Sequence, residues 1–285
     1  MPANKYASGR QHKSFFMNNP LEKIIPGITA IARQAGAAIL DIYHSGADFG
    51  VEAKSDDSPL TKADRASNAV ICSALEVQFP EIPIVSEENK AIPYTERVHF
   101  TQCWMIDPLD GTKEFIRRNG EFTINIALIE AGMPVLGVMY VPVLDEMYWA
   151  VKGAGAWMDA GNGVQPLHAL EYSDADSGLK LVCSRSHMNE ATTAFVNQYR
   201  EPELVSRGSA LKFMLIAKGE AHLYPRLAPT MEWDTAAAQI ILEEAGGQVL
   251  HAQTGKPLVY NKENLLNPEF VAYGKVKGEV EGLRS

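Results

Sequence analysis

Apolar side chains recur every three or four residues in two stretches near the start of the chain. The first stretch follows Pro20, and the second runs from about Lys62 to Phe79, where Pro80 stops it. This spacing places the apolar side chains on one face of a helix. We therefore predict two amphipathic helices. Their apolar positions are Ile24, Ile28, Ile31, Ala35, Ile39 and Ile42 in the first, and Ala63, Ala66, Val70, Ala74 and Val77 in the second.

Short apolar runs follow and predict strands. They comprise residues 84–85, 103–106, 122–130, 135–141 and 147–151. Residues 89–101 are polar and predict a loop, and residues 131–134 predict a hairpin connection.

The pattern changes after Gly163. Strand-like and helical segments alternate from there, at residues 179–183, 189–198, 210–218, 221–224 and 235–245. Strands that come first, followed by α/β alternation, predict two closely packed lobes. We expect a loosely ordered extension over residues 1–19, an α+β lobe over 20–175 and an α/β lobe over 176–285.

Composition limits the classes of partner. The 285 residues are 46% apolar and 21% charged, with a net charge of −9, which is typical of a globular protein. A chain this acidic has no general attraction for nucleic acid polymers or anionic membranes, so a phosphate group would need locally placed cations. The three cysteines are far apart and no apolar run is long enough to span a membrane, which favours the cytoplasm. Contact with the inner face of the membrane stays open, and the sequence does not indicate an oligomeric state.

Several catalytic motifs are absent from the sequence. It contains no phosphate-binding G-x-x-x-x-G-K-[ST], no dinucleotide-binding G-x-G-x-x-G after a strand, no zinc-binding H-E-x-x-H and no G-x-S-x-G. The remaining candidates are carboxylates at the ends of elements.

Asp107 and Asp110 follow a buried strand in the segment D-P-L-D-G-T. A tight turn there can point both carboxylates and the Leu109 carbonyl at one spot, and such hard oxygen donors suit Mg²⁺ or Ca²⁺. The alternative is that Asp-Pro and Asp-Gly simply form a turn.

Three further acidic residues have ordinary structural explanations. Glu87 lies in an acidic pair after a strand and can be a solvated loop residue. Asp234 can be the N-cap of the helix at 235–245, and Asp64 lies in a first helical turn, where negative charge is favoured. These separate structural explanations do not account for the occurrence of all the acidic residues together and in this order.

The set D-P-[IL]-D-G-T, W-D and G-G resembles the signature of the inositol monophosphatase superfamily of Mg²⁺-dependent, lithium-sensitive phosphatases, from about Pro20 to Tyr273. Further segments resemble the CysQ-type 3′(2′),5′-bisphosphate nucleotidases of this superfamily. These segments are 107–115, Ser184-Arg185-Ser186-His187, 208–213 and Leu223-Tyr224-Pro225-Arg226. The resemblance implies a layered αβαβα sandwich, as in inositol monophosphatase and fructose-1,6-bisphosphatase. It also implies hydrolysis of the 3′-phosphate of adenosine 3′,5′-bisphosphate (PAP) to AMP.

The resemblance also implies roles for individual residues. Two or three Mg²⁺ ions are held by Glu87, Asp107, the Leu109 carbonyl, Asp110 and Asp234, so most of the ligands fall in the first lobe. Thr112, hydrogen-bonded to Asp64, orients or deprotonates the attacking water. The substrate contacts are Gly111, Thr112, His187, Ser209, Lys212, Arg226 and Asp234.

Some of these roles have alternatives. Lys212 can be a solvated helix residue, although its spacing from Ser209 would put both on one helix face. His187 can be a capping or core histidine. Inositol phosphates or fructose 1,6-bisphosphate are alternative substrates. An alternative from another class is a catalytically weak regulator that binds phosphorylated metabolites.

Overall fold

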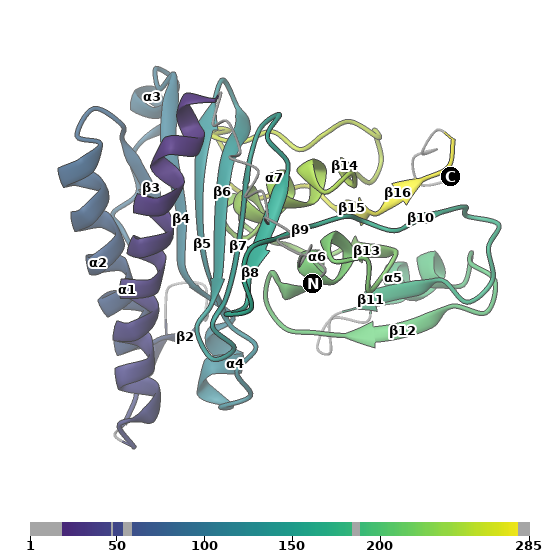
Figure 1. Ribbon diagram of the computed structural model, residues 1–285, viewed down its shortest axis with the longest axis horizontal. Coiled ribbons are helices and arrows are strands. Elements are labelled where there is room, and N and C mark those ends of the chain that lie inside the picture. The colour runs from purple at the N-terminus through teal and green to yellow at the C-terminus, as the bar shows by residue number, and fades with distance from the viewer. Residues whose placement is uncertain (1–18, 47, 54–58, 184–188, 279–285) are drawn as a thin grey trace, which may run out of the picture.

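The computed structural model describes residues 19–46, 48–53, 59–183 and 189–278. Figure 1 shows the layers side by side: a pair of long helices, a large sheet, a second pair of helices, and a smaller sheet with a short helix. Three buried apolar clusters fill the spaces between these layers. The arrangement is the predicted αβαβα sandwich.

The outer helical layer consists of α1 (Ile25–His44) and α2 (Lys62–Gln78). Both helices pack with the large sheet in one buried cluster. In α1 the buried face is the predicted one. In α2 the predicted face is wrong, because the helix turns Ile71 towards the core and leaves Val77 82% exposed. Thr61 begins α2 with a capping box, in which its hydroxyl accepts from the Ala63 N–H and its own N–H donates to Asp64. This box fixes Asp64 in the first turn.

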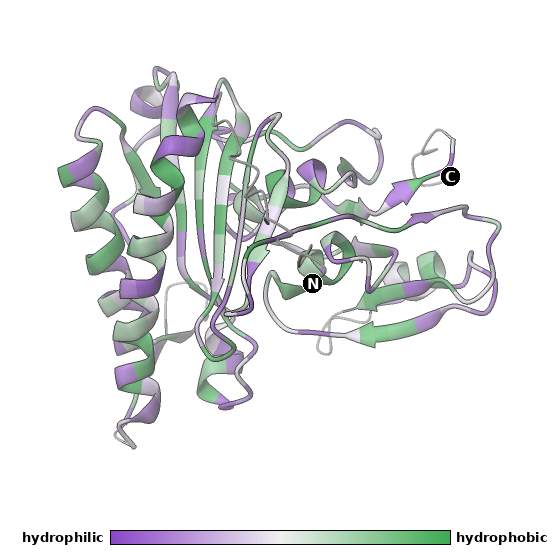
Figure 2. Cartoon of the chain, viewed as in Figure 1, coloured by the Kyte–Doolittle hydropathy of each residue, from purple (hydrophilic) through white to green (hydrophobic). Residues whose placement is uncertain are grey.

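The large sheet has seven strands in the order β3-β4-β5-β6-β7-β8-β9. All neighbours are antiparallel except β3 and β4. Helices cover both faces of the sheet, so its central strands β5 and β6 are almost continuously apolar (Figure 2). Their bounds are Ile84–Ser86, Gln102–Asp110, Thr123–Glu130, Met133–Val141, Glu146–Val151, Ala156–Asp159 and Gln165–Pro166.

The central helical layer consists of α6 (Leu211–Ala217) and α7 (Ala236–Glu244). These two helices pack in one buried cluster between the two sheets. The α7 helix lies very close to β6, because a Cβ placed on Gly137 would be 2.6 Å from the Ala237 carbonyl oxygen and 2.5 Å from the Ile240 side chain. The segment before α7 carries Asp234, so this packing also helps to place a candidate site residue.

The smaller sheet has five strands in the order β12-β11-β13-β15-β14. Their bounds are Glu203–Ser206, Lys180–Cys183, Leu223–Arg226, Phe270–Tyr273 and Gln248–His251. The α5 helix (Glu190–Val196) packs on its outer face, with Phe195 and Val196 in the third buried cluster.

Shorter elements complete the described part of the chain. They are η1 (Pro20–Ile24), β1 (Glu52–Ala53), β2 (Pro59–Leu60), α3 (Tyr94–Arg97), α4 (Thr112–Ile116), β10 (Glu171–Tyr172), η2 (Glu232–Asp234) and β16 (Lys275–Val276). No helix among the described residues is long and apolar enough to cross a membrane.

Two local predictions are wrong. The predicted polar loop at 89–101 contains α3, whose Arg97 is buried and bonds to backbone carbonyls of a distant loop. The strand predicted at 103–106 continues to Asp110. The hairpin between β5 and β6 is confirmed, with Ala131 and Gly132 both at positive φ, as a two-residue hairpin turn requires.

Candidate active site

The D-P-L-D segment lies inside β4 and forms a bulge. Asp107 pairs with Asn125 of β5 and Asp110 pairs with Thr123, so β4 holds one extra residue between these pairs. Pro108 has no N–H to lose from the ladder and suits such a position. The predicted turn after the strand is therefore wrong, and a bulge redirects the side chains instead. The Leu109 N–H donates to Asp107 Oδ1 at 3.0 Å.

Asp107 is buried among other carboxylates. Asp107 is only 1% exposed to solvent. Burial raises the pKa of Asp107 well above its ordinary value, and the charges of Glu87, Asp110 and Asp234 raise it further. Glu87 follows β3, with its N–H donating to the Ile106 carbonyl at 3.2 Å. The structure thus brings together four acidic residues from three segments of the chain.

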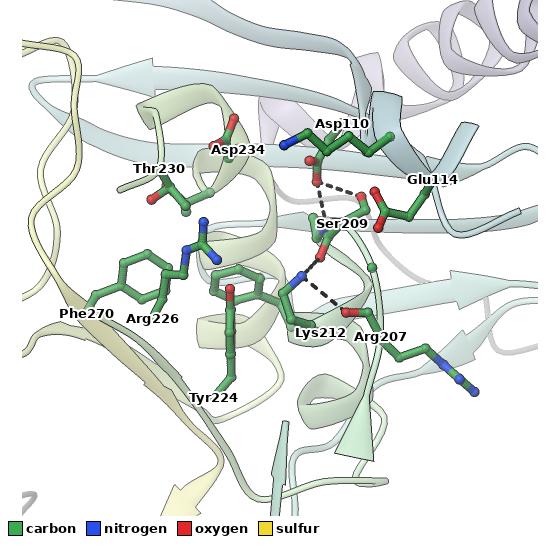
Figure 3. Close-up of a pocket in the computed structure, with 16 residues that line it drawn as sticks. Asp110, Glu114, Arg207, Ser209, Lys212, Tyr224, Arg226, Thr230, Asp234 and Phe270 are labelled. Carbon is green, nitrogen blue, oxygen red and sulfur yellow. Dashed lines mark hydrogen bonds between the residues drawn. The ribbon is translucent and has the colours of Figure 1, made fainter. Parts of the chain in front are cut away.

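Asp110 connects β4 to the segment before α6. Its Oδ2 accepts from the Ser209 hydroxyl and the Ala210 N–H, both at 2.6 Å (Figure 3). Ser209 has a φ of 53° and lies before the first residue of α6. The prediction that Ser209 and Lys212 share a helix face is therefore wrong. Instead, Lys212 Nζ donates to the Ser209 carbonyl at 2.5 Å.

Asp234 belongs to η2 and does not cap α7. Its Oδ2 accepts from the Met231 N–H at 2.9 Å, inside its own short turn. Thr235 is the N-cap residue of α7, so the N-cap interpretation of Asp234 is wrong. Burial raises the pKa of Asp234 well above its ordinary value, and repulsion by Asp110 and Glu87 adds to the shift.

Thr112 and Asp64 lie beside this acidic group. The Thr112 hydroxyl is 3.1 Å from Asp64 Oδ1 and 3.4 Å from the Leu109 carbonyl oxygen. Asp64 Oδ2 accepts from the N–H and the hydroxyl of Thr61 at 2.7 and 2.6 Å. Burial raises the pKa of Asp64, although these hydrogen bonds oppose the shift. The predicted contact between Thr112 and Asp64 is present.

Gly111 allows the chain to turn between Asp110 and Thr112. Its φ is 95°, and an added Cβ would lie 3.0 Å from the Glu121 carbonyl oxygen and 3.2 Å from Ser209 Cβ. Only glycine adopts such a conformation readily. The residue thus brings Asp110 close to Ser209 while Thr112 faces Asp64.

A pocket of about 150 Å³ opens between these elements. Figure 3 shows Asp110 and Asp234 on one side, with Lys212 and Arg226 opposite them. Two carboxylates therefore face two cationic side chains across the pocket.

The two cations are held differently. Lys212 is 7% exposed, with its Nζ 5.4 Å from the centre of the Tyr224 ring. Burial lowers the pKa of Lys212 to about 8, so the solvated-lysine alternative is wrong. Arg226 Nη2 donates to the Pro229 carbonyl at 2.8 Å. The buried Arg226 Nε has no hydrogen-bond partner among the described residues.

Sequence reasoning missed several residues that shape the pocket. Tyr224 and Phe270 line it, and their rings meet edge to face at 5.9 Å. Phe270 lies in β15, and no strand was predicted there, although the apolar run F-V-A-Y offers a signal. Thr123 was also missed; its hydroxyl is 2.7 Å from that of Ser209. The predicted substrate residue His187 lies outside the described residues.

The donors suit a hard divalent cation. They are carboxylate and carbonyl oxygens, and buried carboxylates that repel one another are stabilised by a positive charge. Among the described residues, no three His, Cys, Asp or Glu side chains converge on one metal-binding point. Mg²⁺ commonly uses one or two carboxylates, several waters and substrate phosphate, so this looser grouping fits it.

Comparisons with known proteins show the family of this chain. A model of the inositol monophosphatase family matches residues 20–280. The chain belongs to this family. The 3′(2′),5′-bisphosphate nucleotidase CysQ of Salmonella typhimurium is 47% identical over 244 residues, which cover 85% of this chain and 96% of the relative. CysQ of Escherichia coli strain K12 is 45% identical over the same length, with the same coverage.

A solved structure of a family member has the same fold. The crystal structure of CysQ from Bacteroides thetaiotaomicron is 41% identical and has a TM-score of 0.76. The match covers 88% of this chain and 97% of that one. The predicted family and sandwich architecture are both confirmed.

Proposed function

We propose that this protein is a Mg²⁺-dependent phosphatase that hydrolyses the 3′-phosphate of PAP to give AMP and phosphate. The observation that carries the proposal is the pocket in which the carboxylates Asp110 and Asp234 face the cations Lys212 and Arg226. A bisphosphorylated nucleotide needs both groups of side chains. The carboxylates hold divalent cations at the phosphate that is cleaved, and the fixed cations bind the phosphate that is kept. The names of the CysQ relatives support the choice of substrate.

We assign the metal ligands to Glu87, Asp107, the Leu109 carbonyl, Asp110 and Asp234, for two or three Mg²⁺ ions. When bound, the metal lowers the pKa of a coordinated water and neutralises charge on the phosphate and its leaving oxygen. The chain's own contribution is to hold these oxygens in place. Asp107, Asp110 and Asp234 each use one carboxylate oxygen to accept a backbone N–H.

Thr112 and Asp64 act on the attacking water in this proposal. A hydroxyl has one proton and two lone pairs. Because the Thr112 proton is directed to Asp64 Oδ1, the free lone pair of Thr112 accepts a hydrogen bond from the water and aims its oxygen at phosphorus. Two hydrogen bonds from Thr61 fix Asp64 Oδ2. The Asp64 carboxylate therefore holds the Thr112 hydroxyl in one orientation.

Lys212 and Arg226 bind the 5′-phosphate, and Gly111, Ser209 and His187 contact the nucleotide. The lining of the pocket by Gly111, Ser209, Lys212 and Arg226 supports their assignment. For His187 the support is the resemblance alone. We place the reaction in the cytoplasm, where the buried thiols of Cys72, Cys103 and Cys183 stay reduced.

The decisive experiment compares kcat/KM for PAP, inositol 1-phosphate and fructose 1,6-bisphosphate with Mg²⁺ present. We expect PAP to be preferred by at least tenfold. A preference for either other substrate would overturn the substrate assignment but keep the phosphatase chemistry. No phosphate release from any of the three would favour the regulator alternative.

A further inference from the structure

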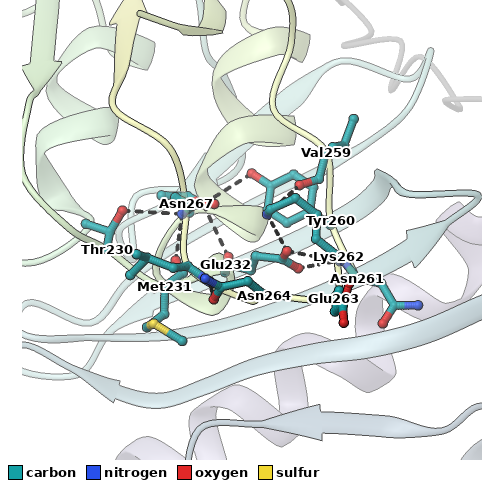
Figure 4. Close-up of polar contacts among 12 residues, drawn as sticks. Thr230, Met231, Glu232, Val259, Tyr260, Asn261, Lys262, Glu263, Asn264 and Asn267 are labelled. Atoms are coloured by element: carbon teal, nitrogen blue, oxygen red, sulfur yellow. Dashed lines mark hydrogen bonds and ion pairs between the residues drawn. The ribbon is translucent and has the colours of Figure 1, made fainter. Parts of the chain in front are cut away.

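A loop that lines no part of the pocket holds the turn that carries Asp234. Figure 4 shows this brace loop, residues 259–267, lying against residues 230–235. Its Asn267 donates from the side-chain amide to the Met231 carbonyl at 2.7 Å and to the Thr235 hydroxyl at 3.0 Å. The Glu232 N–H donates to the Leu265 carbonyl at 2.9 Å. The turn is therefore tied to the brace loop on both sides of Asp234.

Glu232 holds the other end of the same loop. Its residue is fully buried, and its carboxylate accepts from the N–H groups of Asn261 at 2.5 Å and Lys262 at 3.2 Å. It also forms an ion pair with the Lys262 ammonium group. A buried carboxylate is costly unless it is fully paired. All of the bonds described for this one go to the brace loop.

The brace loop is itself fixed to the segment after Glu87. Arg97 Nη1 donates to Asn261 Oδ1 and to the Lys262 carbonyl, both at 2.8 Å, and its Nε donates to the Ile92 carbonyl at 3.0 Å. The Asn261 amide donates back to the Arg97 carbonyl at 2.8 Å. One loop thus connects the α3 region, which follows Glu87, to the turn that carries Asp234.

The η2 turn has three residues and little stability of its own. Asp234 is partly buried there beside Asp110, Asp107 and Glu87, which repel it. Without external bonds, the repulsion would move the turn away from the acidic group. The brace loop supplies those bonds, and none of its residues lines the pocket.

We propose that Glu232 and Asn267 are positioning residues that hold Asp234 at the metal site. The inference rests on the proposed function, because it takes Asp234 as a metal ligand. Neither Glu232 nor Asn267 lines the pocket, so their effect passes through residues 230–235.

The test is Mn²⁺ binding, measured by electron paramagnetic resonance, together with the Mg²⁺ dependence of phosphate release from PAP. Glu232→Gln keeps the shape of the side chain but replaces one acceptor with an NH₂ group that faces N–H donors. We expect a loss of about tenfold in metal affinity, since residues that orient metal ligands typically contribute this much. The KM for PAP at saturating Mg²⁺ stays within about twofold.

The matched control is Glu244→Gln. Glu244 also clamps a loop with its carboxylate, accepting from the N–H groups of Gly153 and Gly155 at 2.8 and 2.9 Å, but it lines no described pocket. We expect this variant to keep its metal affinity even if its melting temperature falls. Equal losses of affinity in the two variants would overturn the proposal, as would normal affinity in folded Glu232→Gln protein.

A second variant covers the case in which Glu232→Gln does not fold. Asn267→Ala removes the amide bonds to Met231 and Thr235 and must also weaken Mn²⁺ binding; normal binding would overturn the proposal. The binding measurement separates the two hypotheses. If the wild-type protein binds Mn²⁺ but does not hydrolyse PAP, the proposed function fails and the positioning role is still measured. If it binds no Mn²⁺, the metal assignment itself is wrong.

Discussion

The Thr112 hydroxyl lies between the Asp64 carboxylate, at 3.1 Å, and the Leu109 carbonyl, at 3.4 Å. Its proposed task is to aim a water molecule, so it acts in the transition state more than in substrate binding. We predict that Thr112→Ala lowers kcat by about 10²-fold, the lower range for such proton-handling groups. The KM for PAP should change by less than about threefold. Steady-state phosphate release measures both quantities.

Thr112→Ser is the matched control because it keeps the hydroxyl. We expect it to retain most of the wild-type kcat. If Thr112→Ala raised only KM, Thr112 would bind the substrate and would not orient the water.

Lys212 gives the active site a pH limit. Burial lowers the pKa of its ammonium group to about 8, so the free enzyme loses this cation as the pH rises through that value. We predict that kcat/KM for PAP falls above about pH 8, because the 5′-phosphate loses a charged donor. A pH profile from 6.5 to 9.5 at fixed Mg²⁺ measures this.

Lys212→Arg tests the cause, since arginine stays charged throughout this range. Its profile should be flatter, and an unchanged fall would assign the pH dependence to another group. Stability should move in the opposite direction to activity. The unfolded lysine keeps its proton up to about 10.5, so the unfolded state binds more protons above pH 8 and stability rises with pH.

At the scale of elements, the close approach of α7 to β6 sets the position of the turn before α7. An added methyl group at Gly137 would collide with the Ala237 backbone and the Ile240 side chain. We predict that Gly137→Ala destabilises the fold by about 1–3 kcal/mol, as overpacking typically does, and also lowers kcat because Asp234 moves with α7. Chemical denaturation and phosphate release measure the two effects.

Gly27→Ala is a suitable control, because its added methyl meets only the flexible end of the Gln78 side chain, at 3.1 Å. Alanine is also favoured over glycine in a helix, so this variant should be neutral or more stable. Equal destabilisation in both variants would mean that the close packing of β6 against α7 does not cause the loss of stability.

Elements were predictable where one physical signal dominated. The periodicity over 24–42 and 62–79 predicted α1 and α2, because each buries one face against a sheet. The end of β4 was not predictable, because Asp-Pro is read locally as a turn. Only pairing with β5 extends the strand through Asp110. The left-handed conformation of Ser209 was missed for the same reason, since its bonds to Asp110 and Thr123 come from distant parts of the chain.

At the scale of the whole molecule, the sequence predicted the family and the layer order but not the brace loop. Motif spacing carries information about groups that touch a substrate. It carries none about Arg97, Glu232 and Asn267. Their contacts that involve the brace loop span 29 to 166 residues along the chain, as in Asn261 to Glu232 and Arg97 to Glu263. These residues hold the turn that carries Asp234 without lining the pocket, and only the folded structure shows these contacts.

The acidic group also links the metal to the stability of the whole fold. Burial and mutual repulsion raise the pKa of Asp107 and of Asp234. In metal-free protein the folded state therefore holds protons that the unfolded chain releases above its ordinary aspartate pKa, so stability falls as the pH rises. In the proposed function Mg²⁺ binds the folded state, which would offset this loss by about 2.7 kcal/mol at a concentration 100-fold above its Kd.

We predict that the melting temperature in excess EDTA is lower at pH 8 than at pH 5.5, and that Mg²⁺ raises it more at pH 8. Asp107→Asn should raise the metal-free melting temperature at pH 8, because it removes one of the crowded charges, and should reduce the Mg²⁺ effect. Asp41→Asn, at an exposed position of α1, is the control and should change neither. If Mg²⁺ stabilised the wild type and Asp107→Asn equally, the ion would bind elsewhere. The negative charge of Asp107, one part of the net charge of −9, would then have no role in holding the metal.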